Sequence, residues 1–301
     1  MQKAIVTGGA GFIGSHVVDR LLEQNFEVIV IDNESSDAHE QFYYNDKATY
    51  YNYDIRNYDM IEPLFKGVDY VFHLAAESRI QPAIENPIYA VEANVTGTCN
   101  ILQASRVHKI KRVMYSSTSA AYGLINEPPL KEDMITDCLN PYSVSKCAGE
   151  ELCKMYSDLF GLDTVIFRYF NVYGERQPTK GQYAPVIGLF FRQKESGHPM
   201  SVVGDGLQTR DYTYVGDVVS ANIAATYIDA GLGEIYNVGT GISYSVLDIV
   251  EMIKGEHIHI PARPGEARYT NADTSKICNK LKWNPSVKVD DWINDYKSKK
   301  I

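Results

Sequence analysis

The first residues of this 301-residue chain constrain its fold more than any other segment. An apolar run over residues 4–7 leads into Gly8, Gly11 and Gly14, which have the spacing G-x-x-G-x-x-G, and a helical pattern follows. Glycines placed so between a strand and a helix allow a tight turn, close approach of a pyrophosphate, and close helix–strand packing. The helix N-terminus also offers unpaired N–H groups to phosphates. The segment predicts a dinucleotide-binding unit.

Short apolar runs and helical patterns alternate through the first half of the chain. We predict strands over residues 4–7, 28–31, 50–53, 70–74, 112–116 and 164–168, and helices over residues 12–24, 88–107 and 142–160. Apolar strands separated by helices are typical of a parallel sheet covered on both faces. The expected fold is α/β, with a Rossmann-type doubly wound parallel sheet and a smaller α/β substrate-binding lobe.

Glycines and prolines divide the second half into shorter pieces, which suits a smaller lobe. We therefore predict a cofactor-binding domain over residues 1–170 and a mainly substrate-binding lobe over residues 171–301. Some segments of the second part are expected to return to the first domain. The polar tail after Trp283 is expected to lie on the surface.

Composition excludes several functional classes. The net charge of −9 and the pI of about 5.3 disfavour a nucleic-acid binder, which needs a basic face. The sequence contains no apolar stretch of the ~20 residues that a membrane helix needs. Met1 is followed almost at once by the first strand, so we expect no signal peptide and a cytoplasmic protein.

Neither the cysteines nor the histidines predict a metal site. The five cysteines are odd in number and form no C-x-x-C pair, which favours buried free thiols in a reducing compartment. His257 and His259 alternate with Ile258 and Ile260, a pattern that indicates a strand with one polar face.

Asp32 stands at the end of the second predicted strand, where a carboxylate can accept hydrogen bonds from an adenosine ribose. It would repel a 2′-phosphate, so the residue favours NAD over NADP. A simple turn aspartate before Asn33 is the weaker interpretation. Asp54 and Ile55, after the third strand, are candidates to frame the adenine, with a surface turn nearly as good an interpretation.

A candidate catalytic pair begins the helix predicted over residues 142–160. Asn140 suits an N-cap and Pro141 the first helical position, and Tyr142 and Lys146, four residues apart, share one helix face. A neighbouring ammonium and the positive helix end favour the phenolate of a tyrosine. Lowering its pKa by about three units corresponds to roughly 4 kcal/mol. An exposed Tyr–Lys pair without function would also be common by chance.

Small hydroxyl residues end the fifth predicted strand, in the segment Ser-Ser-Thr-Ser-Ala-Ala-Tyr-Gly over residues 116–123. Such residues at a strand's C-terminal end line the crevice where ligands bind in these folds. One of them could bond a sugar hydroxyl beside Tyr142. A Ser/Thr-rich loop explains any single member of the set, but explains the whole set less well.

These segments together resemble a known family. The glycine turn, Phe-His-Leu-Ala-Ala at 72–76, the loop at 116–123, Tyr142 with Lys146, and Arg-Tyr-Phe-Asn-Val-Tyr-Gly at 168–174 occur in this order. The chain is similar to extended short-chain dehydrogenases, and specifically to the UDP-glucose and UDP-N-acetylglucosamine 4-epimerases. The resemblance continues through residues 204–212 and 263–266.

The resemblance implies a role for each matching residue. It implies that Thr118, Tyr142 and Lys146 are catalytic and that the cofactor is NAD. It implies cofactor contacts from Gly8, Gly11, Phe12, Ile13, Gly14, Asp32, Asn33, Asp54, Ile55, Leu74, Ala75, Ala76, Asn94, Tyr142 and Lys146. The matching substrate-binding positions are Thr118, Asn171, Arg210, Arg263, Glu266 and Thr270, with Asn171 and the two arginines holding UDP. Two arginines suit a diphosphate, although a structural salt bridge is the alternative for each.

Residues next to Thr118 help to choose among related reactions. Sugar-nucleotide 4,6-dehydratases carry an acidic pair directly after this threonine, whereas Ser119 and Ala120 stand here. The cysteine that the loop holds in GDP-sugar epimerase–reductases is also absent. We therefore expect a 4-epimerase that acts through a 4-keto intermediate on UDP-hexoses. The alternatives are a 4-ketoreductase, a UDP-glucuronate 4-epimerase, or a silent NAD-binding scaffold.

Two further expectations concern pocket size and assembly. Thr270 aligns with the wall of the hexose pocket, where a small residue leaves room for an acetamido group; a slip of one residue would put the bulky Tyr269 there. The helices predicted over 88–107 and 142–160 have apolar residues on a second face, such as Val144, Leu152, Met155 and Leu159. The resemblance implies a homodimer through these helices; a monomer with exposed apolar residues is the alternative.

Overall fold

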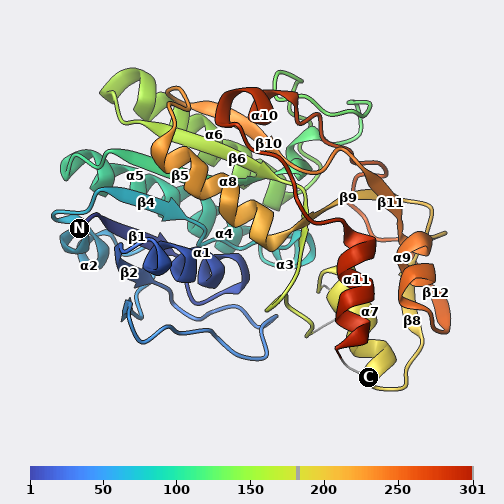
Figure 1. Ribbon diagram of the computed structural model, residues 1–301. Coiled ribbons are helices and arrows are strands. Elements are labelled where there is room, and N and C mark those ends of the chain that lie inside the picture. Colours follow the sequence, from blue (N-terminus) through green and yellow to red (C-terminus); the bar gives the residue numbers. More distant parts are fainter. Residues whose placement is uncertain (181–183, 300–301) are drawn as a thin grey trace.

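The computed structural model describes residues 1–180 and 184–299. Its centre is a seven-stranded sheet in the order β10-β6-β5-β4-β1-β2-β3, and all its strands are parallel (Figure 1). The strands are β1 (Lys3–Thr7), β2 (Glu27–Ile31), β3 (Thr49–Tyr51), β4 (Tyr70–His73), β5 (Arg112–Thr118), β6 (Thr164–Tyr169) and β10 (Glu234–Val238). Strands β2 and β3 follow β1 on one side of the sheet, and β4, β5, β6 and β10 follow one another on the other side. This order is that of a Rossmann-type sheet, so the predicted fold class is confirmed.

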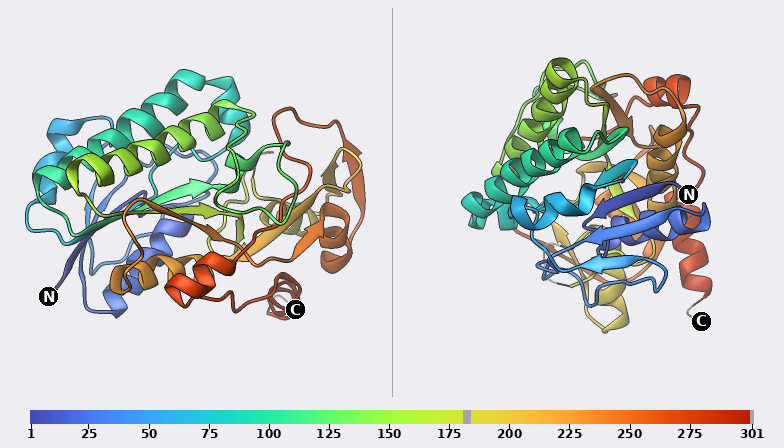
Figure 2. Two further views of the ribbon diagram at one scale, coloured as in Figure 1. Left: turned by 90° about the horizontal axis from the view of Figure 1, so that it is seen from above. Right: turned by 90° about the vertical axis from the view of Figure 1, so that its left-hand side faces the viewer.

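Two apolar cores lie on opposite faces of the sheet, because successive strand residues point to opposite sides. Ala4 and Val6 pack against α1 (Phe12–Glu23), α8 (Val215–Tyr227) and α10 (Ser275–Leu281). Ile5 faces the other core, to which α5 (Gly97–Val107) and α6 (Pro141–Phe160) contribute. Figure 2 shows these two helical layers above and below the sheet. Both faces are covered, which explains why the strands are nearly continuous apolar runs.

The second half of the chain contributes to both parts of the molecule. Strand β10 and helices α8 and α10 belong to the central sheet and its cover. The remainder forms a lobe with its own apolar core, at the right of Figure 1. The lobe contains β7 (Asn171–Tyr173), β8 (Met200–Val203), β9 (Thr209–Tyr214), β11 (Ser243–Ser245), β12 (His257–Ile260), α7 (Val186–Glu195), α9 (Val246–Ile253) and α11 (Val289–Ser298).

The helix predicted over residues 88–107 is interrupted. The structure has α4 (Pro87–Val91), a π-helical turn (Glu92–Thr96), and then α5. Single wide turns of this kind recur near functional sites. Short helices α2 (Tyr58–Ile61) and α3 (Ile80–Glu85) and 3-10 turns at Glu62–Phe65 and Ser119–Tyr122 complete the sequence of elements.

The prediction for the tail after Trp283 was wrong. Helix α11 buries Val289, Trp292 and Ile293 in the lobe core, and the Trp292 indole donates to Glu175 Oε1 at 2.8 Å. Trp292 and Ile293 lie three and four residues after Val289, which places all three on one helix face. The polar residues of the tail cover the outer side of that helix.

Three smaller predictions also change. The third strand is Thr49–Tyr51 rather than 50–53, and among the free cysteines only Cys153 is buried. The strand at His257 and His259 exists, but among the described strands it pairs with β8 alone, and it leaves Ile258 about half exposed.

Within the described residues, 1–180 and 184–299, no helix is both long enough and apolar enough to cross a membrane.

Candidate active site

A cavity of about 560 Å³ lies at the carboxyl ends of the sheet strands, between the sheet and the lobe. This is the usual place and size for a ligand site in an open α/β sheet. The cavity lining includes the catalytic candidates Thr118, Tyr142 and Lys146, and every other predicted site residue except Asn94. The fold thus gathers positions from residue 8 to residue 270 around one cavity.

The glycine turn forms one end of the cavity, and its backbone could not accept side chains. Gly8 has φ +67°, and a Cβ there would stand 2.8 Å from the backbone nitrogen of Ala75. A Cβ on Gly14 would collide with the carbonyl oxygen of Gly8. Because Gly8, Gly11 and Gly14 carry no side chains, phosphate oxygens can approach the backbone N–H groups at the start of α1.

Asp32 lies beside this turn and orders the backbone around it. Its carboxylate accepts hydrogen bonds from the N–H groups of Ala10 at 3.0 Å and Glu34 at 2.8 Å. Burial raises the pKa of Asp32, and these two N–H donors oppose that shift. Nearby, the Asn33 amide donates to Asp54 Oδ2 at 3.0 Å. The glycine turn and the cavity-facing carboxylate fit the phosphate and ribose groups of a dinucleotide.

Substituting Gly14 with alanine should remove the bound dinucleotide. The added methyl group must displace the Gly8 carbonyl and with it the turn that receives the phosphates. We expect NAD released from denatured Gly14→Ala protein to fall by at least about tenfold in mass spectrometry, relative to the parent.

The matched control is Gly255→Ala, whose added Cβ would make only an ordinary contact with Met200 in the lobe. It should retain the parental amount of cofactor. Equal NAD content in both variants would refute the role given to the turn.

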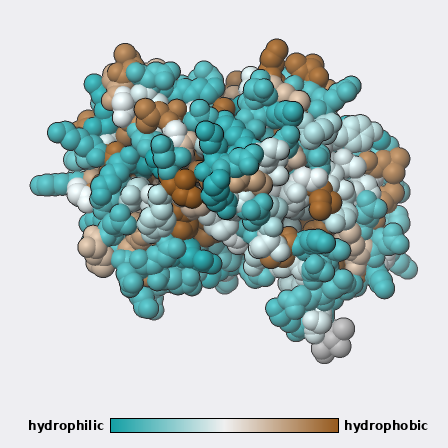
Figure 3. Space-filling model, turned by 45° about the horizontal axis from the view of Figure 1, so that its top comes forward, coloured by the Kyte–Doolittle hydropathy of each residue, from teal (hydrophilic) through white to brown (hydrophobic). Residues whose placement is uncertain are grey.

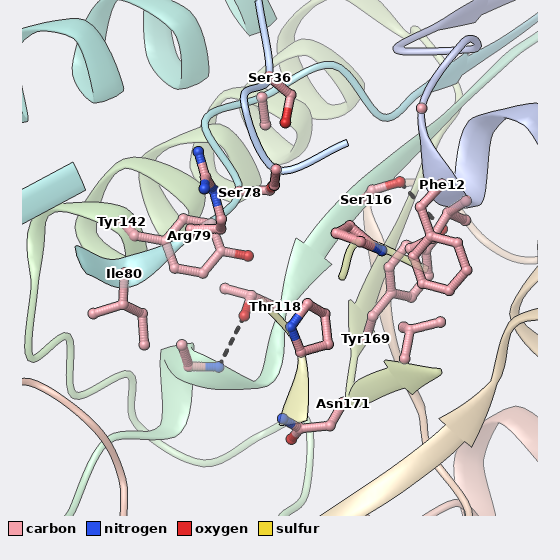
Figure 4. Close-up of a pocket in the computed structure, with 18 of the residues that line it drawn as sticks. Phe12, Ser36, Ser78, Arg79, Ile80, Ser116, Thr118, Tyr142, Tyr169 and Asn171 are labelled. Atoms are coloured by element: carbon pink, nitrogen blue, oxygen red, sulfur yellow. Dashed lines mark hydrogen bonds between the residues drawn. The ribbon is translucent and has the colours of Figure 1, made fainter. Parts of the chain in front are cut away.

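Tyr142 and Thr118 meet at the centre of the cavity, as Figure 4 shows. The helix that carries Tyr142 begins as predicted: Asn140 caps α6 by accepting from Ser143 N at 2.8 Å, and Pro141 is the first helical residue. Thr118 ends β5, and its hydroxyl accepts from Ala120 N at 3.1 Å. The same hydroxyl lies near the Tyr142 phenol and acts to lower its pKa.

The predicted lowering of the Tyr142 pKa is wrong. Burial raises the pKa of Tyr142 to about 12, and the Thr118 hydroxyl only partly opposes it. Burial also lowers the pKa of Lys146 to about 8. The Lys146 ammonium lies 4.5 Å from the centre of the Tyr115 ring. An ammonium and a helix N-terminus favour the phenolate, but the loss of water around the phenol outweighs both.

Asn94 lies one layer behind the cavity wall. It is 1% exposed, and its amide group donates to Glu77 O and Ser145 Oγ, each at 2.9 Å, while its oxygen accepts from Glu77 N at 2.8 Å. Asn94 therefore joins the loop after β4 to α6. Asn94 does not line the cavity itself. It holds Glu77 and Ser145, which are the chain neighbours of the cavity-lining Ala76 and Lys146.

The lobe supplies the other end of the cavity. The Arg210 guanidinium donates to the carbonyls of Thr209 at 2.9 Å and Arg268 at 3.1 Å, and lies 3.6 Å from Glu266. Arg263 and Asn171 line the same end. Asn140, the cap of α6, donates to Gly265 O at 2.8 Å and so joins α6 to this segment.

The structure places Thr270 in the cavity wall and Tyr269 outside it. Thr270 is 5% exposed and lines the cavity, whereas Tyr269 is 52% exposed. Thr270 N donates to Thr209 O at 3.2 Å, which fixes this register beside Arg210. The small side chain is thus the one that bounds the ligand space.

Arg79 and Tyr169 line the cavity but were not identified from the sequence. Arg79 follows β4, and its guanidinium pairs with Asp37 at 2.6 Å across to the loop after β2. Tyr169 ends β6, and its hydroxyl accepts from Ser116 Oγ at 3.1 Å (Figure 4). Both residues lie at or after the carboxyl end of a parallel strand, where ligands bind in such sheets. That position was the sequence signal that could have identified them.

Comparison with known proteins identifies the family. A family model described as the NAD dependent epimerase/dehydratase family matches residues 4–239. The chain belongs to this family. Its members' dependence on NAD agrees with the dinucleotide cradle described above, and this protein is an enzyme with NAD as its cofactor.

Individual members of the epimerase family resemble the chain over nearly its whole length. It is 41% identical over 297 residues to a putative UDP-glucose 4-epimerase of Methanocaldococcus jannaschii, covering 96% of this chain and 95% of that protein. A UDP-N-acetylglucosamine 4-epimerase from Methanobrevibacter ruminantium, solved with UDP-N-acetylmuramic acid, matches with TM-score 0.92, 32% identity, and coverage of 100% and 99%. A UDP-glucuronic acid 4-epimerase from Bacillus cereus, solved with UDP-glucuronic acid and NAD, matches with TM-score 0.88, 31% identity and 100% coverage of both chains.

Proposed function

We propose that this enzyme is a 4-epimerase that interconverts UDP-glucose with UDP-galactose, and also their N-acetylated forms. The observation that carries the proposal is the placement of Tyr142 and Thr118 between the glycine turn and the Arg210 end of one cavity. That arrangement puts a proton-transferring group between a dinucleotide cradle and cationic donors suited to a diphosphate. The relatives are named as 4-epimerases of three different UDP-sugars, so their names leave the sugar open.

The residues divide the chemistry as follows. Tyr142 accepts the proton of the sugar 4-hydroxyl, and the Thr118 hydroxyl, which lines the cavity beside it, binds and orients the same sugar hydroxyl. Lys146 supplies an ammonium on the same face of α6 and binds the cofactor ribose. Bound NAD would supply a reversible hydride acceptor for C4 of the sugar, and the positive charge of its oxidised form would favour the Tyr142 phenolate.

Inversion requires that the 4-keto sugar present its other face before the hydride returns. Arg210, Arg263 and Asn171 hold the nucleotide end, so the hexose can turn about its diphosphate while the UDP stays bound. Ser119 and Ala120 follow Thr118 where a dehydratase needs an acidic pair, and neither side chain can serve as a general acid. This favours epimerisation over elimination.

Anomeric-proton NMR on a panel of UDP-hexoses, without added reductant, tests the proposal. We expect UDP-glucose and UDP-galactose to interconvert to the same final ratio from either side, and UDP-N-acetylglucosamine to react as well. A net 4-ketoreductase would need a reduced cofactor for each turnover and would give no such equilibrium. Reaction of UDP-glucuronate alone would reassign the sugar, and inertness towards every sugar would refute the function.

We also propose that the enzyme forms a homodimer through α5 and α6. These helices pack side by side on one face of the sheet (Figure 2). Val144, Met155 and Leu159 of α6 are 52%, 38% and 68% exposed, whereas Leu152 packs against the core. Figure 3, which turns the top of the molecule forward, shows apolar side chains among hydrophilic ones on this side. Pairing across a two-fold axis would cover them in a four-helix bundle.

Light scattering at micromolar concentration should therefore give twice the mass of the chain. Introducing a charge with Leu159→Glu should produce a monomer, because the charge would be buried in the bundle. Ile258→Glu, on the half-exposed edge strand of the lobe, is the matched control and should remain dimeric. A monomeric parent protein would contradict the proposed assembly.

A further inference from the structure

A fully buried ion pair lies behind the cavity and takes no part in the chemistry proposed above. Glu150 on α6 and Arg168 on β6 are each 1% exposed. Arg168 Nε donates to Glu150 Oε1 at 2.9 Å and Nη2 donates to Oε2 at 2.7 Å, a two-pronged arrangement. A buried pair of this kind is often no more stable than apolar side chains of the same volume. Its presence therefore calls for a role other than stability.

The Glu150 carboxylate also binds the strand that ends in Thr118. Ser117, the residue before Thr118 on β5, donates its hydroxyl proton to Glu150 Oε1 at 2.5 Å. One carboxylate thus joins three elements: α6, which carries Tyr142, β5, and β6. A shift of Glu150 would move Thr118 relative to Tyr142, the two groups that share the cavity centre.

The same carboxylate lies one helical turn from Lys146, on the same face of α6. The titratable groups around Lys146 are Tyr142, Cys147, Glu150 and Cys153 of α6, His73 of β4 and Tyr115 of β5, and the charged Arg168 of β6 is bound to Glu150. Burial raises the pKa of the Cys147 and Cys153 thiols and lowers that of His73 to about 3, so at neutral pH these three are uncharged. Burial likewise holds the pKa of Tyr115 well above its usual value. Burial lowers the pKa of Lys146, and Glu150, the one carboxyl group of this set, is among the groups that oppose that shift while its own counter-ion is Arg168.

We propose that Glu150, held by Arg168, is a positioning residue for the epimerase reaction: it anchors the end of β5 that carries Thr118 to α6, and it keeps Lys146 in its charged form. This inference rests on the roles proposed for Thr118, Tyr142 and Lys146. The anchoring role follows from the hydrogen bonds that Glu150 accepts from Ser117 of β5 and Arg168 of β6. The electrostatic role follows from its place one helical turn from Lys146.

The opposite ends of the same two strands offer a matched control. Arg112, the first residue of β5, donates through Nε to Asp163 Oδ2 at 2.8 Å, just before β6 begins. This pair is also largely buried, with side chains 12% and 21% exposed. It joins β5 to the start of β6 at the end of the sheet away from the cavity.

The test compares Glu150→Gln with Asp163→Asn, both purified with bound NAD. For Glu150→Gln we expect kcat to fall by about tenfold, with KM for UDP-glucose changed less than about twofold, because a displaced Thr118 weakens the reacting geometry more than substrate binding. Loss of the negative charge lowers the pKa of Lys146, so the alkaline limb of the kcat profile should move to lower pH. Asp163→Asn should lower the melting temperature but leave kcat and the pH profile at parental values.

A readout that needs no turnover separates this inference from the proposed function. In protein labelled with [ε-¹³C]lysine, the Lys146 signal, assigned with Lys146→Arg, should titrate at lower pH in Glu150→Gln than in the parent. An inactive parent that still shows this shift would refute the function and leave the electrostatic role intact. If Glu150→Gln fails to fold, Glu150→Gln combined with Arg168→Met removes the unpaired buried cation. Parental kcat and an unshifted Lys146 titration in the folded variant would overturn the inference, as would equal losses of kcat in Asp163→Asn.

Discussion

Tyr142→Phe should lower kcat by about 10³, within the range for loss of a positioned proton-transfer group, while NAD remains bound. Phenylalanine keeps the ring that fills the cavity beside Thr118 but cannot accept the proton of the sugar 4-hydroxyl. The Thr118 hydroxyl keeps its hydrogen bond from Ala120 N. The fold should be unaffected, since Asn140 and Pro141 still begin α6.

The measurement is steady-state turnover of UDP-glucose together with NAD content by mass spectrometry. Tyr227→Phe makes the same chemical change on the exposed part of α8, where the hydroxyl donates to Gln24 Oε1 at 3.2 Å, and should keep parental kcat. Near-parental turnover in Tyr142→Phe would remove Tyr142 from the mechanism. Loss of NAD together with activity would indicate a structural effect instead.

Thr270→Tyr should abolish turnover of UDP-N-acetylglucosamine while sparing UDP-glucose. Thr270 is buried in the cavity wall, so a phenol there takes volume that an acetamido group would occupy. We expect the ratio of kcat/KM for the two sugars to change by at least about 100-fold, because a filled space excludes the larger substrate whereas spare room costs the smaller one little.

Two variants control for damage at this position. Thr270→Ser keeps the hydroxyl that accepts from Asp211 N at 3.4 Å and should turn over both sugars. Tyr269→Thr changes the outward-facing neighbour and should leave the preference unchanged. A parent that ignores the N-acetylated sugar, or an unchanged preference in Thr270→Tyr, would show that this wall does not select the sugar.

Local sequence signals predicted the parts of the site that depend on neighbouring residues. The glycine turn, the cap at Asn140 with Pro141, and the i, i+4 pair of Tyr142 and Lys146 are each fixed by short-range geometry, and the structure contains all of them. The central sheet followed from apolar runs between helices for the same reason. These features need no knowledge of distant contacts.

Features that depend on long-range packing could not be predicted in the same way. The pKa of Tyr142 is set by the water excluded when the lobe and sheet enclose the phenol, which no local pattern records. Arg79 enters the cavity because the loop after β4 meets the loop after β2. Asn94 occupies a π-helical turn that hides it behind Glu77 and Ser145. Helix α11, which contains Trp292, could have been predicted from the sequence, because Val289, Trp292 and Ile293 have helical spacing. The many polar residues around them favoured the wrong prediction of a surface tail.

The most direct test of the central claim follows one hydrogen atom. Incubating the NAD-loaded enzyme with UDP-[4-²H]glucose, without added cofactor, should give UDP-galactose that retains deuterium at C4. Retention is expected because the hydride leaves C4 and returns to the same carbon while Tyr142 exchanges only the hydroxyl proton. Galactose product with hydrogen at C4, or turnover only when reduced cofactor is supplied, would contradict an epimerase that works through a reversible hydride transfer.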